Sequence, residues 1–238
     1  RLGASVRVVV RGDQILRGFD DDVRTHLAQD LVHSGLQLDF GRHVTGITQT
    51  DDGLQVELDH EETFAADCVL RALGRKPNTE GLGLEALGIA LDAHGAIPVD
   101  NYGQTTVPGI HAVGDVTNRV NLTPMAIREG HAFADTVFGG TPRSVDHTLI
   151  PTAVFTTPEL GVVGLTEQAA LEHHPRLDVY RATFRPMKAT LSGHPGKMLL
   201  KLLVDRDTGR VLGFHGVGPD TGEMAQLVGV AMQLQATK

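Results

Sequence analysis

The stretch that most constrains the fold of this chain runs from residue 109 to residue 130 and reads GIHAVGDVTNRVNLTPMAIREG. The apolar run from Ile110 to Val113 predicts a short strand, and the Gly-Asp pair after it predicts a tight turn. Thr123 is a typical N-cap residue and Pro124 a typical first helical residue, so we expect a helix to begin there. The pattern therefore predicts a strand, a polar loop and a helix in succession.

This order of elements places a carboxylate beside a helix N-terminus. Asp115 would lie at the end of the strand, and the free N–H groups and dipole of the helix favour an anion or an electron-rich ring edge. A carboxylate in that position can accept hydrogen bonds from the hydroxyls of a ribose or a ribityl chain. The residues fit equally well with an ordinary strand–turn–helix unit in which Asp115 is only a capping residue.

Composition excludes several classes of function. The 238 residues predict one or two domains, and 41% hydrophobic residues can form a sizeable core. The net charge of −8 (21 − 29), without a Lys/Arg stripe, argues against a nucleic-acid partner. No apolar run reaches the length of a membrane span and no signal peptide opens the chain, so we expect no membrane partner. The single cysteine, Cys68, is typical of a reducing compartment, and its apolar surroundings predict a packing role in a strand.

The first third of the chain reads as the later part of an α/β nucleotide-binding domain. Residues 5–10 predict a buried parallel strand, and the acidic run at residues 20–22 predicts the start of a helix that ends at Gly35. We expect short strands near residues 36–40, 44–50, 54–58 and 68–72, with a hairpin turn at residues 51–53.

The remainder predicts one more helical unit and then a mostly antiparallel region. We expect a strand and loop over residues 97–107, and a helix after Thr123 with an apolar face formed by Ile127, Ala134, Val137 and Phe138. From residue 150 the pattern predicts strands at 151–155, 177–184, 198–204 and 211–217, and a short helix capped by Thr166. A final helix would present Met224, Leu227, Val228, Ala231 and Leu234 on one face, which suits a subunit interface or an ordinary core.

Arg11 and Arg17 give the sharpest chemical signal in the first third of the chain. In a Rossmann domain, the residues just past the second strand meet the adenosine ribose, and arginine there accommodates the 2′-phosphate of NADP. Two guanidinium groups on one loop suit a dianionic phosphate through bidentate hydrogen bonds. Two solvated loop arginines are the plain alternative.

The sequence HAVGDV followed by NLTPMAIREG resembles the second flavin-binding motif of the pyridine nucleotide-disulfide oxidoreductases, and more narrowly that of the glutathione reductase branch. The resemblance implies that Asp115, with Gly114, binds the ribityl chain of FAD. It also implies that a helix N-terminus lies against the pyrimidine side of the isoalloxazine, set there by Asn121, Leu122 and Thr123. The spacing of the two arginines matches the motif that grips the 2′-phosphate of NADPH.

The same resemblance assigns four further residues. Gly74 and Arg75 belong to a Gly-Arg-Lys-Pro-Asn junction that lies next to the dinucleotide in the family. Ala153 belongs to a strand that passes close to the nicotinamide side of the flavin. His131 stands where better-known members have an arginine that holds a glutathione carboxylate, so His131 is a candidate substrate contact.

The architecture implied is an α/β fold: residues 1–77 as the later part of a Rossmann-type NADPH domain, residues 78–148 as the C-terminal part of an FAD domain, and residues 149–238 as a truncated α+β dimerisation domain with an antiparallel sheet. One cysteine cannot form the redox-active pair of the family, and the acid–base His-Glu pair would lie beyond Lys238. We therefore assign no catalytic residue and no metal ligand, and we expect these residues alone to be inactive.

The sequence thus predicts a C-terminal part of a cytoplasmic, homodimeric enzyme that reduces oxidised glutathione with NADPH through FAD. Within the same class, a mercuric, lipoamide or other flavin disulfide reductase shares Asp115 and the general frame. A non-catalytic binding or dimerisation remnant is the alternative from a different class.

Overall fold

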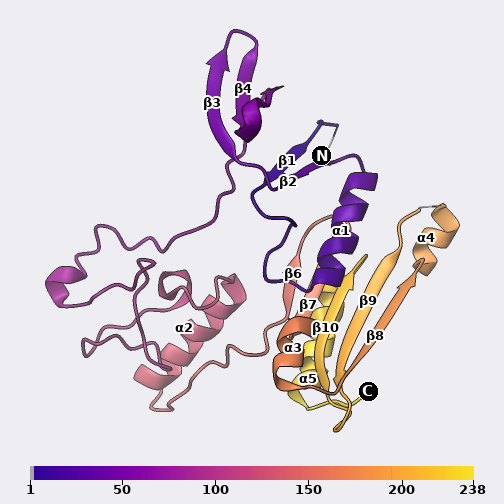
Figure 1. The fold of residues 1–238 in the computed structure, drawn as a ribbon. Helices are drawn as coiled ribbons and strands as arrows, with labels where there is room; N and C mark the ends of the chain where they lie inside the picture. Colours follow the sequence, from indigo (N-terminus) through magenta and orange to yellow (C-terminus); the bar gives the residue numbers. More distant parts are fainter. Residues whose placement is uncertain (1–2, 194) are drawn as a thin grey trace. The chain divides into compact units, whose positions relative to one another are not determined.

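The computed structural model describes residues 3–193 and 195–238, which form two compact units. One unit combines residues 1–70 with residues 149–238, and the other comprises residues 71–148. Figure 1 shows the chain coloured along the sequence. The first unit is therefore discontinuous in sequence, because the beginning and the end of the chain pack together.

The chain begins with a strand–helix–strand unit. Strand β1 (Arg7–Val10) pairs in parallel with β2 (Gln37–Phe40), and helix α1 (Asp21–His33) connects them. The predicted helix is confirmed, with Asp20 as its N-cap and with Gly35 at φ +90° just beyond its C-cap. Strand β1 is shorter than predicted and only half-buried, since its one hydrogen-bonded partner in the described chain is β2.

A three-stranded antiparallel meander follows, formed by β3 (Val44–Thr50), β4 (Gly53–Leu58) and β5 (Thr63–Ala66). The hairpin at residues 51–53 is confirmed, but the strand predicted at residues 68–72 is wrong. The β4–β5 pairing ends at Leu54↔Ala66, next to the beginning of β4 at Gly53, so β4 has no residues left to pair with residues 68–72. Cys68 is exposed, and the predicted packing role for its side chain is therefore wrong as well.

The C-terminal part of the first unit is a five-stranded antiparallel sheet in the order β6-β7-β10-β9-β8. Its elements are β6 (Thr152–Val154), β7 (Leu160–Gly164), α3 (Glu167–His173), β8 (Leu177–Phe184), α4 (Met187–Ser192), β9 (Met198–Asp205), β10 (Val211–Val217) and α5 (Thr221–Gln233). The predicted strands and the helix capped by Thr166 are confirmed, since the Thr166 hydroxyl accepts a hydrogen bond from the Ala169 amide.

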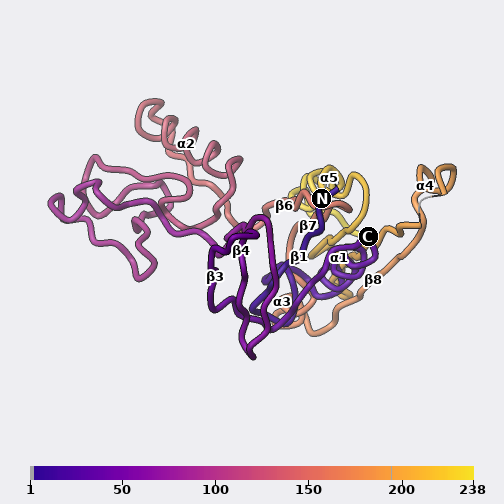
Figure 2. Tube along the Cα trace, turned by 90° about the horizontal axis from the view of Figure 1, so that it is seen from above, coloured from indigo at the N-terminus to yellow at the C-terminus, as the bar shows by residue number. Residues whose placement is uncertain are grey.

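The two faces of this sheet are covered by helices from opposite ends of the chain. Val23 and Leu27 of α1 pack in one core cluster with three sheet residues, Leu160, Leu199 and Val217. The other face packs against α5 through Val163, Phe214 and Ala225. Because side chains alternate along a strand, one sheet serves both clusters. In Figure 2, α5 and α1 lie on opposite sides of β7.

Helix α5 packs with part of the predicted face, because Met224 and Val228 lie against the cluster of Val163, Phe214 and Ala225. Its buried residues are small, Thr221, Ala225 and Gly229. A Cβ on Gly229 would lie 2.6 Å from the Cγ of Pro151, so only glycine permits this approach. Leu227 and Leu234, predicted on the same face, are 71% and 79% exposed, so the chain itself does not bury that whole face.

The second unit, residues 71–148, contains little regular structure. Its elements are two 3₁₀ turns, η2 (Glu85–Leu87) and η3 (Gly114–Thr117), and helix α2 (Thr123–Val137), around a core of Ile89, Ile97 and Ala112. The strands predicted at residues 97–107 and 110–113 are wrong. Backbone hydrogen bonds there close local turns, and one isolated bridge joins Gln104 to His111.

Helix α2 begins one residue earlier than predicted, because Leu122 is the N-cap and Thr123 is the first helical residue. Its buried residues are Met125 and Glu129, whereas Ile127, Val137 and Phe138 of the predicted apolar face are 55%, 43% and 80% exposed. Across the described residues, no helix is long and apolar enough to cross a membrane.

Candidate functional site

The Gly114–Asp115 turn is built around a glycine that no other residue could replace without strain. Gly114 has φ +74°, and a Cβ at this position would lie 2.9 Å from the Cβ of Ala126 on α2. The Thr117 hydroxyl donates to the Gly114 carbonyl at 2.8 Å, and the Asn118 amide donates to the Asp115 carbonyl at 3.1 Å. The backbone of the turn is therefore closed and lies directly on the first turns of α2.

The side chain of Asp115 points away from this tight packing. The residue is exposed, and among the described residues its carboxylate has no hydrogen-bond or salt-bridge partner. Nearby, α2 begins at Leu122 and Thr123 without a side-chain cap. The Met125 and Ala126 amides donate to the Leu122 carbonyl and Pro124 has no N–H, so among the described residues the Thr123 amide is the one first-turn donor left without a partner. Asn121 stabilises the intervening loop by donating from Nδ2 to Oδ1 of Asn118 at 3.1 Å. The turn thus offers a carboxylate acceptor, and the start of α2 offers the Thr123 amide as a donor.

The buried side chain of Glu129 on α2 holds the Gly114–Asp115 turn in place. Its side chain is 4% exposed, and Oε2 accepts a hydrogen bond from the Gly114 amide at 2.6 Å. Oε1 lies 2.7 Å from Nε2 of His147 and 3.0 Å from Nη2 of Arg119. Sequence analysis missed Glu129 because an acid in mid-helix is usually solvated. The signal available was only its spacing, four residues after Met125, on the packed face of α2.

The loop between β1 and α1 presents both predicted arginines to solvent. Arg11 and Arg17 are exposed, and within the described chain neither guanidinium forms a hydrogen bond or a salt bridge. Arginines on the neighbouring elements are paired instead; Arg7, for example, lies against Asp39 and 2.6 Å from Glu62. The loop is therefore free to bind an anion with two cations.

The other predicted residues are placed as follows. Gly74, at φ +113°, and Arg75 lie in an exposed irregular segment. His131 is exposed on α2. Ala153 lies in β6, and its Cβ faces α5 so closely that a Cβ on Gly222 would lie 3.1 Å away. Any contact of Ala153 with a ligand on the other side of β6 would therefore use its backbone.

The predicted residues divide between the two units. Gly114, Asp115 and residues 121–123 surround the start of α2 in the second unit, where Gly74, Arg75 and His131 also belong. Arg11, Arg17 and Ala153 belong to the first unit. Within the part of the chain that the structure describes, no group of three or more His, Cys, Asp or Glu residues could hold a metal ion.

A buried ion cluster next to the arginine loop was not predicted. The ammonium of Lys201 on β9 lies 2.6 Å from Oδ1 of Asp20, and both side chains are 2% exposed. The same nitrogen lies 2.6 Å from Asp22 and 2.7 Å from Glu167. Burial raises the pKa of Asp20, but hydrogen bonds from Lys201 and from the Glu167 amide lower it by more, so this pKa lies below its usual range.

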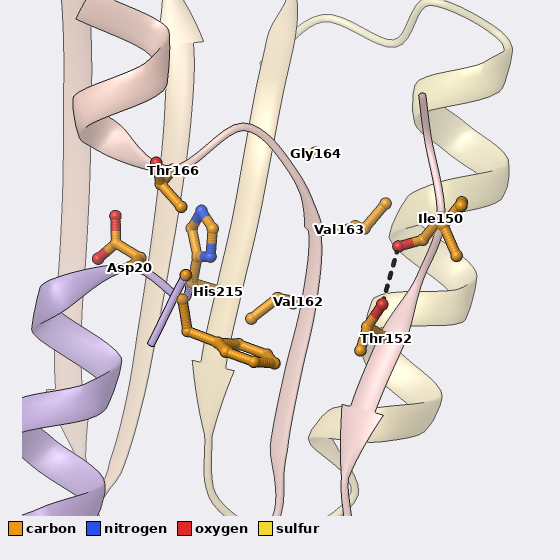
Figure 3. A pocket seen from close by; sticks show the side chains of 10 residues that line it. Asp20, Ile150, Thr152, Val162, Val163, Gly164, Thr166 and His215 are labelled. Carbon is orange, nitrogen blue, oxygen red and sulfur yellow. Dashed lines mark hydrogen bonds between the residues drawn. The ribbon is translucent and has the colours of Figure 1, made fainter. Parts of the chain in front are cut away.

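A histidine borders this cluster and a cavity of about 200 Å³. The ring of His215 lies between Asp20 and Val162, as Figure 3 shows. Its Nε2 lies 2.8 Å from the Leu165 carbonyl, and Nδ1 is buried with no hydrogen-bond partner in the described residues. Burial lowers the pKa of His215, so the ring is neutral at pH 7 and Nε2 carries the proton that the carbonyl accepts.

Comparison with known proteins agrees with this organisation. The family model described as pyridine nucleotide-disulphide oxidoreductase matches residues 1–130, and the model of its dimerisation domain matches residues 150–238. Among solved structures, the HOCl-induced flavoprotein disulfide reductase RclA from Escherichia coli is similar with a TM-score of 0.88 and 31% identity. That alignment covers 98% of this chain and 53% of the other. The predicted α/β class with a C-terminal antiparallel sheet is confirmed.

Two curated relatives extend over the same residues. A glutathione reductase from Burkholderia cepacia is 48% identical over 237 residues, which are 100% of this chain and 53% of that protein. A trypanothione reductase from Trypanosoma congolense is 39% identical over 237 residues, which are 99% of this chain and 48% of that protein. The chain thus spans about half the length of the curated relatives it matches. With one family model over its first 130 residues and a second over residues 150–238, this chain belongs to the pyridine nucleotide-disulfide oxidoreductase family.

Proposed function

We propose that this chain forms the C-terminal half of a flavoprotein that reduces oxidised glutathione with NADPH. The observation that carries the proposal is the Gly114–Asp115 turn, where an exposed carboxylate without a partner stands near the uncapped start of α2. A buried glycine and the buried Glu129 hold this turn in place. That combination is typical of a preorganised binding site.

The residues of the turn fit the polar chain and ring of FAD. The Asp115 carboxylate would accept hydrogen bonds from ribityl hydroxyls, and the Thr123 amide with the positive end of the α2 dipole would meet an electron-rich ring edge. Asn121, Leu122 and Thr123 would set the position of that helix end. When bound, FAD accepts electrons from NADPH and delivers them to a disulfide.

The arginine loop fits the phosphate that distinguishes NADPH from NADH. Arg11 and Arg17 are exposed and unpaired in the described chain, and a 2′-phosphate dianion can accept two charge-assisted hydrogen bonds from each guanidinium. We place Gly74 and Arg75 beside the dinucleotide as well, and the backbone of Ala153 on the nicotinamide side of the flavin.

The substrate would be a small disulfide, which takes two electrons and two protons to become two thiols. His131, exposed on α2, would meet a glutathione carboxylate and would do so best when protonated. The trypanothione reductase relative, at 39% identity, makes a different disulfide the second candidate. One exposed cysteine cannot form a redox pair, so we expect residues 1–238 alone to be inactive. We propose a reducing, cytoplasmic compartment, since a single free cysteine is typical of one.

We propose a homodimer built on the C-terminal sheet. Helix α5 leaves Leu227, Val230 and Leu234 71%, 53% and 79% exposed on one side, and single-chain packing does not use them. Apolar side chains gathered on one helix are typical of an interface between subunits. The match of residues 150–238 to the dimerisation domain of the family supports the same proposal.

The test is made on the full reading frame that encodes this chain. We expect a bound flavin spectrum, oxidation of NADPH in preference to NADH, and turnover with oxidised glutathione in a panel that also holds trypanothione disulfide, a lipoamide disulfide and mercuric ion. Asp115→Ala should lose flavin, whereas Asp135→Ala, an acid on the exposed side of α2, should retain it. A purified protein without flavin would overturn the proposal, and turnover with another member of the panel would reassign the substrate.

A further inference from the structure

The loop that carries Arg11 and Arg17 is held by two different parts of the molecule. Its first half is attached to the strand pair at the start of the chain. The Gly41 amide donates to the Gly12 carbonyl at 2.8 Å, and the Arg42 amide donates to the Val10 carbonyl at 3.2 Å. The backbone at Arg11 therefore follows the β1–β2 pair.

The second half of the loop is attached to the C-terminal sheet instead. Ile15, Leu16 and Phe19 pack against the core cluster that contains Leu160, Leu199 and Val217 of β7, β9 and β10. Arg17 lies between these anchored positions, and the Phe19 amide donates to the Leu16 carbonyl at 3.2 Å. The distance between the two arginines thus depends on how the start of the chain sits on the C-terminal sheet.

Asp20 fastens the end of the loop to that sheet. Oδ1 accepts hydrogen bonds from the Asp22 amide at 3.1 Å and from Lys201 Nζ at 2.6 Å. Oδ2 accepts one from the Glu167 amide at 2.9 Å, at the start of α3. One carboxylate therefore joins the first turn of α1, the first turn of α3 and strand β9. In Figure 3, Asp20 lies beside Thr166, the N-cap of α3.

Lys201 is the cation that makes this junction possible. It is 2% exposed and contacts Asp20, Asp22 and Glu167, while Arg181 closes the outer side at 2.6 Å from both Asp22 and Glu167. Two cations thus face three carboxylates. Without the ammonium, Asp20 would be a buried charge without a counterion, a state that proteins relieve by movement or hydration.

We infer that Lys201 is a positioning residue for recognition of the nucleotide 2′-phosphate, acting by locking Asp20 to β9 and thereby fixing Arg17 relative to Arg11. This inference rests on the proposed use of NADPH. Lys201 itself is buried and does not contact the nucleotide in this scheme. Two bidentate guanidinium contacts to one phosphate demand a fixed spacing, so small displacements of Arg17 weaken them.

The central experiment compares NADPH with NADH in the full-length protein. Lys201→Met keeps the length and apolar stem of the side chain and removes its charge. We expect the KM for NADPH to rise about tenfold while the KM for NADH changes less than about twofold, a coupling of ordinary size for residues linked through a backbone shift. The comparison isolates the 2′-phosphate, because NADH lacks only that group.

A matched control separates positioning from general loss of stability. Phe214→Leu weakens the opposite face of the same sheet, the face that packs against α5. Phe214 is 6% exposed and belongs to a different core cluster from the one that holds Ile15, Leu16 and Phe19. This variant should lower the melting temperature without changing the ratio of the KM for NADPH to the KM for NADH. If Lys201→Met does not fold, Arg181→Gln, whose side chain is 45% exposed, loosens the same cluster and should shift the ratio in the same direction by a smaller factor.

A double-mutant cycle completes the test. In an Arg17→Ala background, Lys201→Met should no longer change the KM for NADPH, because the residue through which it acts is gone. Equal effects of Lys201→Met with and without Arg17, or equal effects on NADPH and NADH, would overturn the inference. A wild-type protein without any preference for NADPH would instead overturn the proposed function.

Discussion

Replacement of Glu129 tests the binding turn most directly. In Glu129→Ala, the buried Gly114 amide loses the acceptor that lies 2.6 Å away, which costs about 1–3 kcal/mol. His147 and Arg119 also lose a charged partner, but their side chains are 23% and 26% exposed and can be hydrated, so we assign about 0.5 kcal/mol to each. The sum predicts a loss of about 3 kcal/mol in the free energy that keeps the turn closed.

This loss corresponds to an increase of about a hundredfold in the open population of the turn. We expect the amide of Gly114 and the first turns of α2 to exchange hydrogen faster by that factor, measured by mass spectrometry. We also expect the intact protein to release its flavin at a lower denaturant concentration. Glu129→Gln keeps an acceptor for the Gly114 amide and should lose only about 1 kcal/mol.

The control for this experiment lies on the same helix. Asp135 pairs with Arg143 at 3.2 Å, but the two side chains are 49% and 64% exposed. Exposed pairs contribute little, so Asp135→Ala should stay within about 0.5 kcal/mol of the wild type. If the Gly114 amide exchanged hydrogen at equal rates in Glu129→Ala and Asp135→Ala, the buried Glu129 carboxylate would not be what holds the turn.

Three further predictions follow from the same contacts. Gly114→Ala should abolish flavin retention, because its methyl group would lie 2.9 Å from the Ala126 Cβ at a backbone φ of +74°; a normal flavin content would contradict this. Arg11→Ala and Arg17→Ala should each raise the KM for NADPH about tenfold and leave that for NADH unchanged, and parallel changes would refute a 2′-phosphate contact. Burial lowers the pKa of His215 below its ordinary value of 6.5, so on acidification below that value the unfolded state binds a proton that the folded state does not. The free energy of unfolding should then fall by up to about 1.4 kcal/mol per pH unit, a slope that His215→Leu should reduce.

Elements with a strong local pattern were predictable from the sequence. Helix α1 has an N-cap, an acidic first turn and a glycine stop, and the ladder of β8, β9 and β10 has apolar-rich runs of seven or eight residues with a Thr-Gly turn. The misassigned strands at residues 97–107 and 110–113 are apolar segments whose backbone groups are satisfied by turns rather than by a neighbouring strand. Apolar content alone does not distinguish these two solutions.

The candidate site was predictable where a motif lies within a few residues, and not where it depends on distant contacts. The exposed Asp115 and the two exposed arginines follow from local order along the chain. Glu129 acts on a glycine 15 residues away, and Lys201 acts on an aspartate 181 residues away. Neither residue type indicates burial by itself, since Lys and Glu are usually exposed and become buried only when paired.

The contact between Asp20 and Lys201 also bears on how this part of the protein folds. Val23 and Leu27 are fully buried, and the residues they pack with, Leu160, Leu199 and Val217, lie more than a hundred positions later. Residues 1–70 alone would expose the apolar face of α1. Residues 149–238 alone would expose one face of their sheet and leave Lys201 with Glu167 but without Asp20 and Asp22. Because each segment completes the core of the other, the arginine loop and the C-terminal sheet gain stability together. Any ligand that binds the folded loop must therefore also stabilise the C-terminal sheet against unfolding, and dimer formation through that sheet must stabilise the loop against unfolding in the same way.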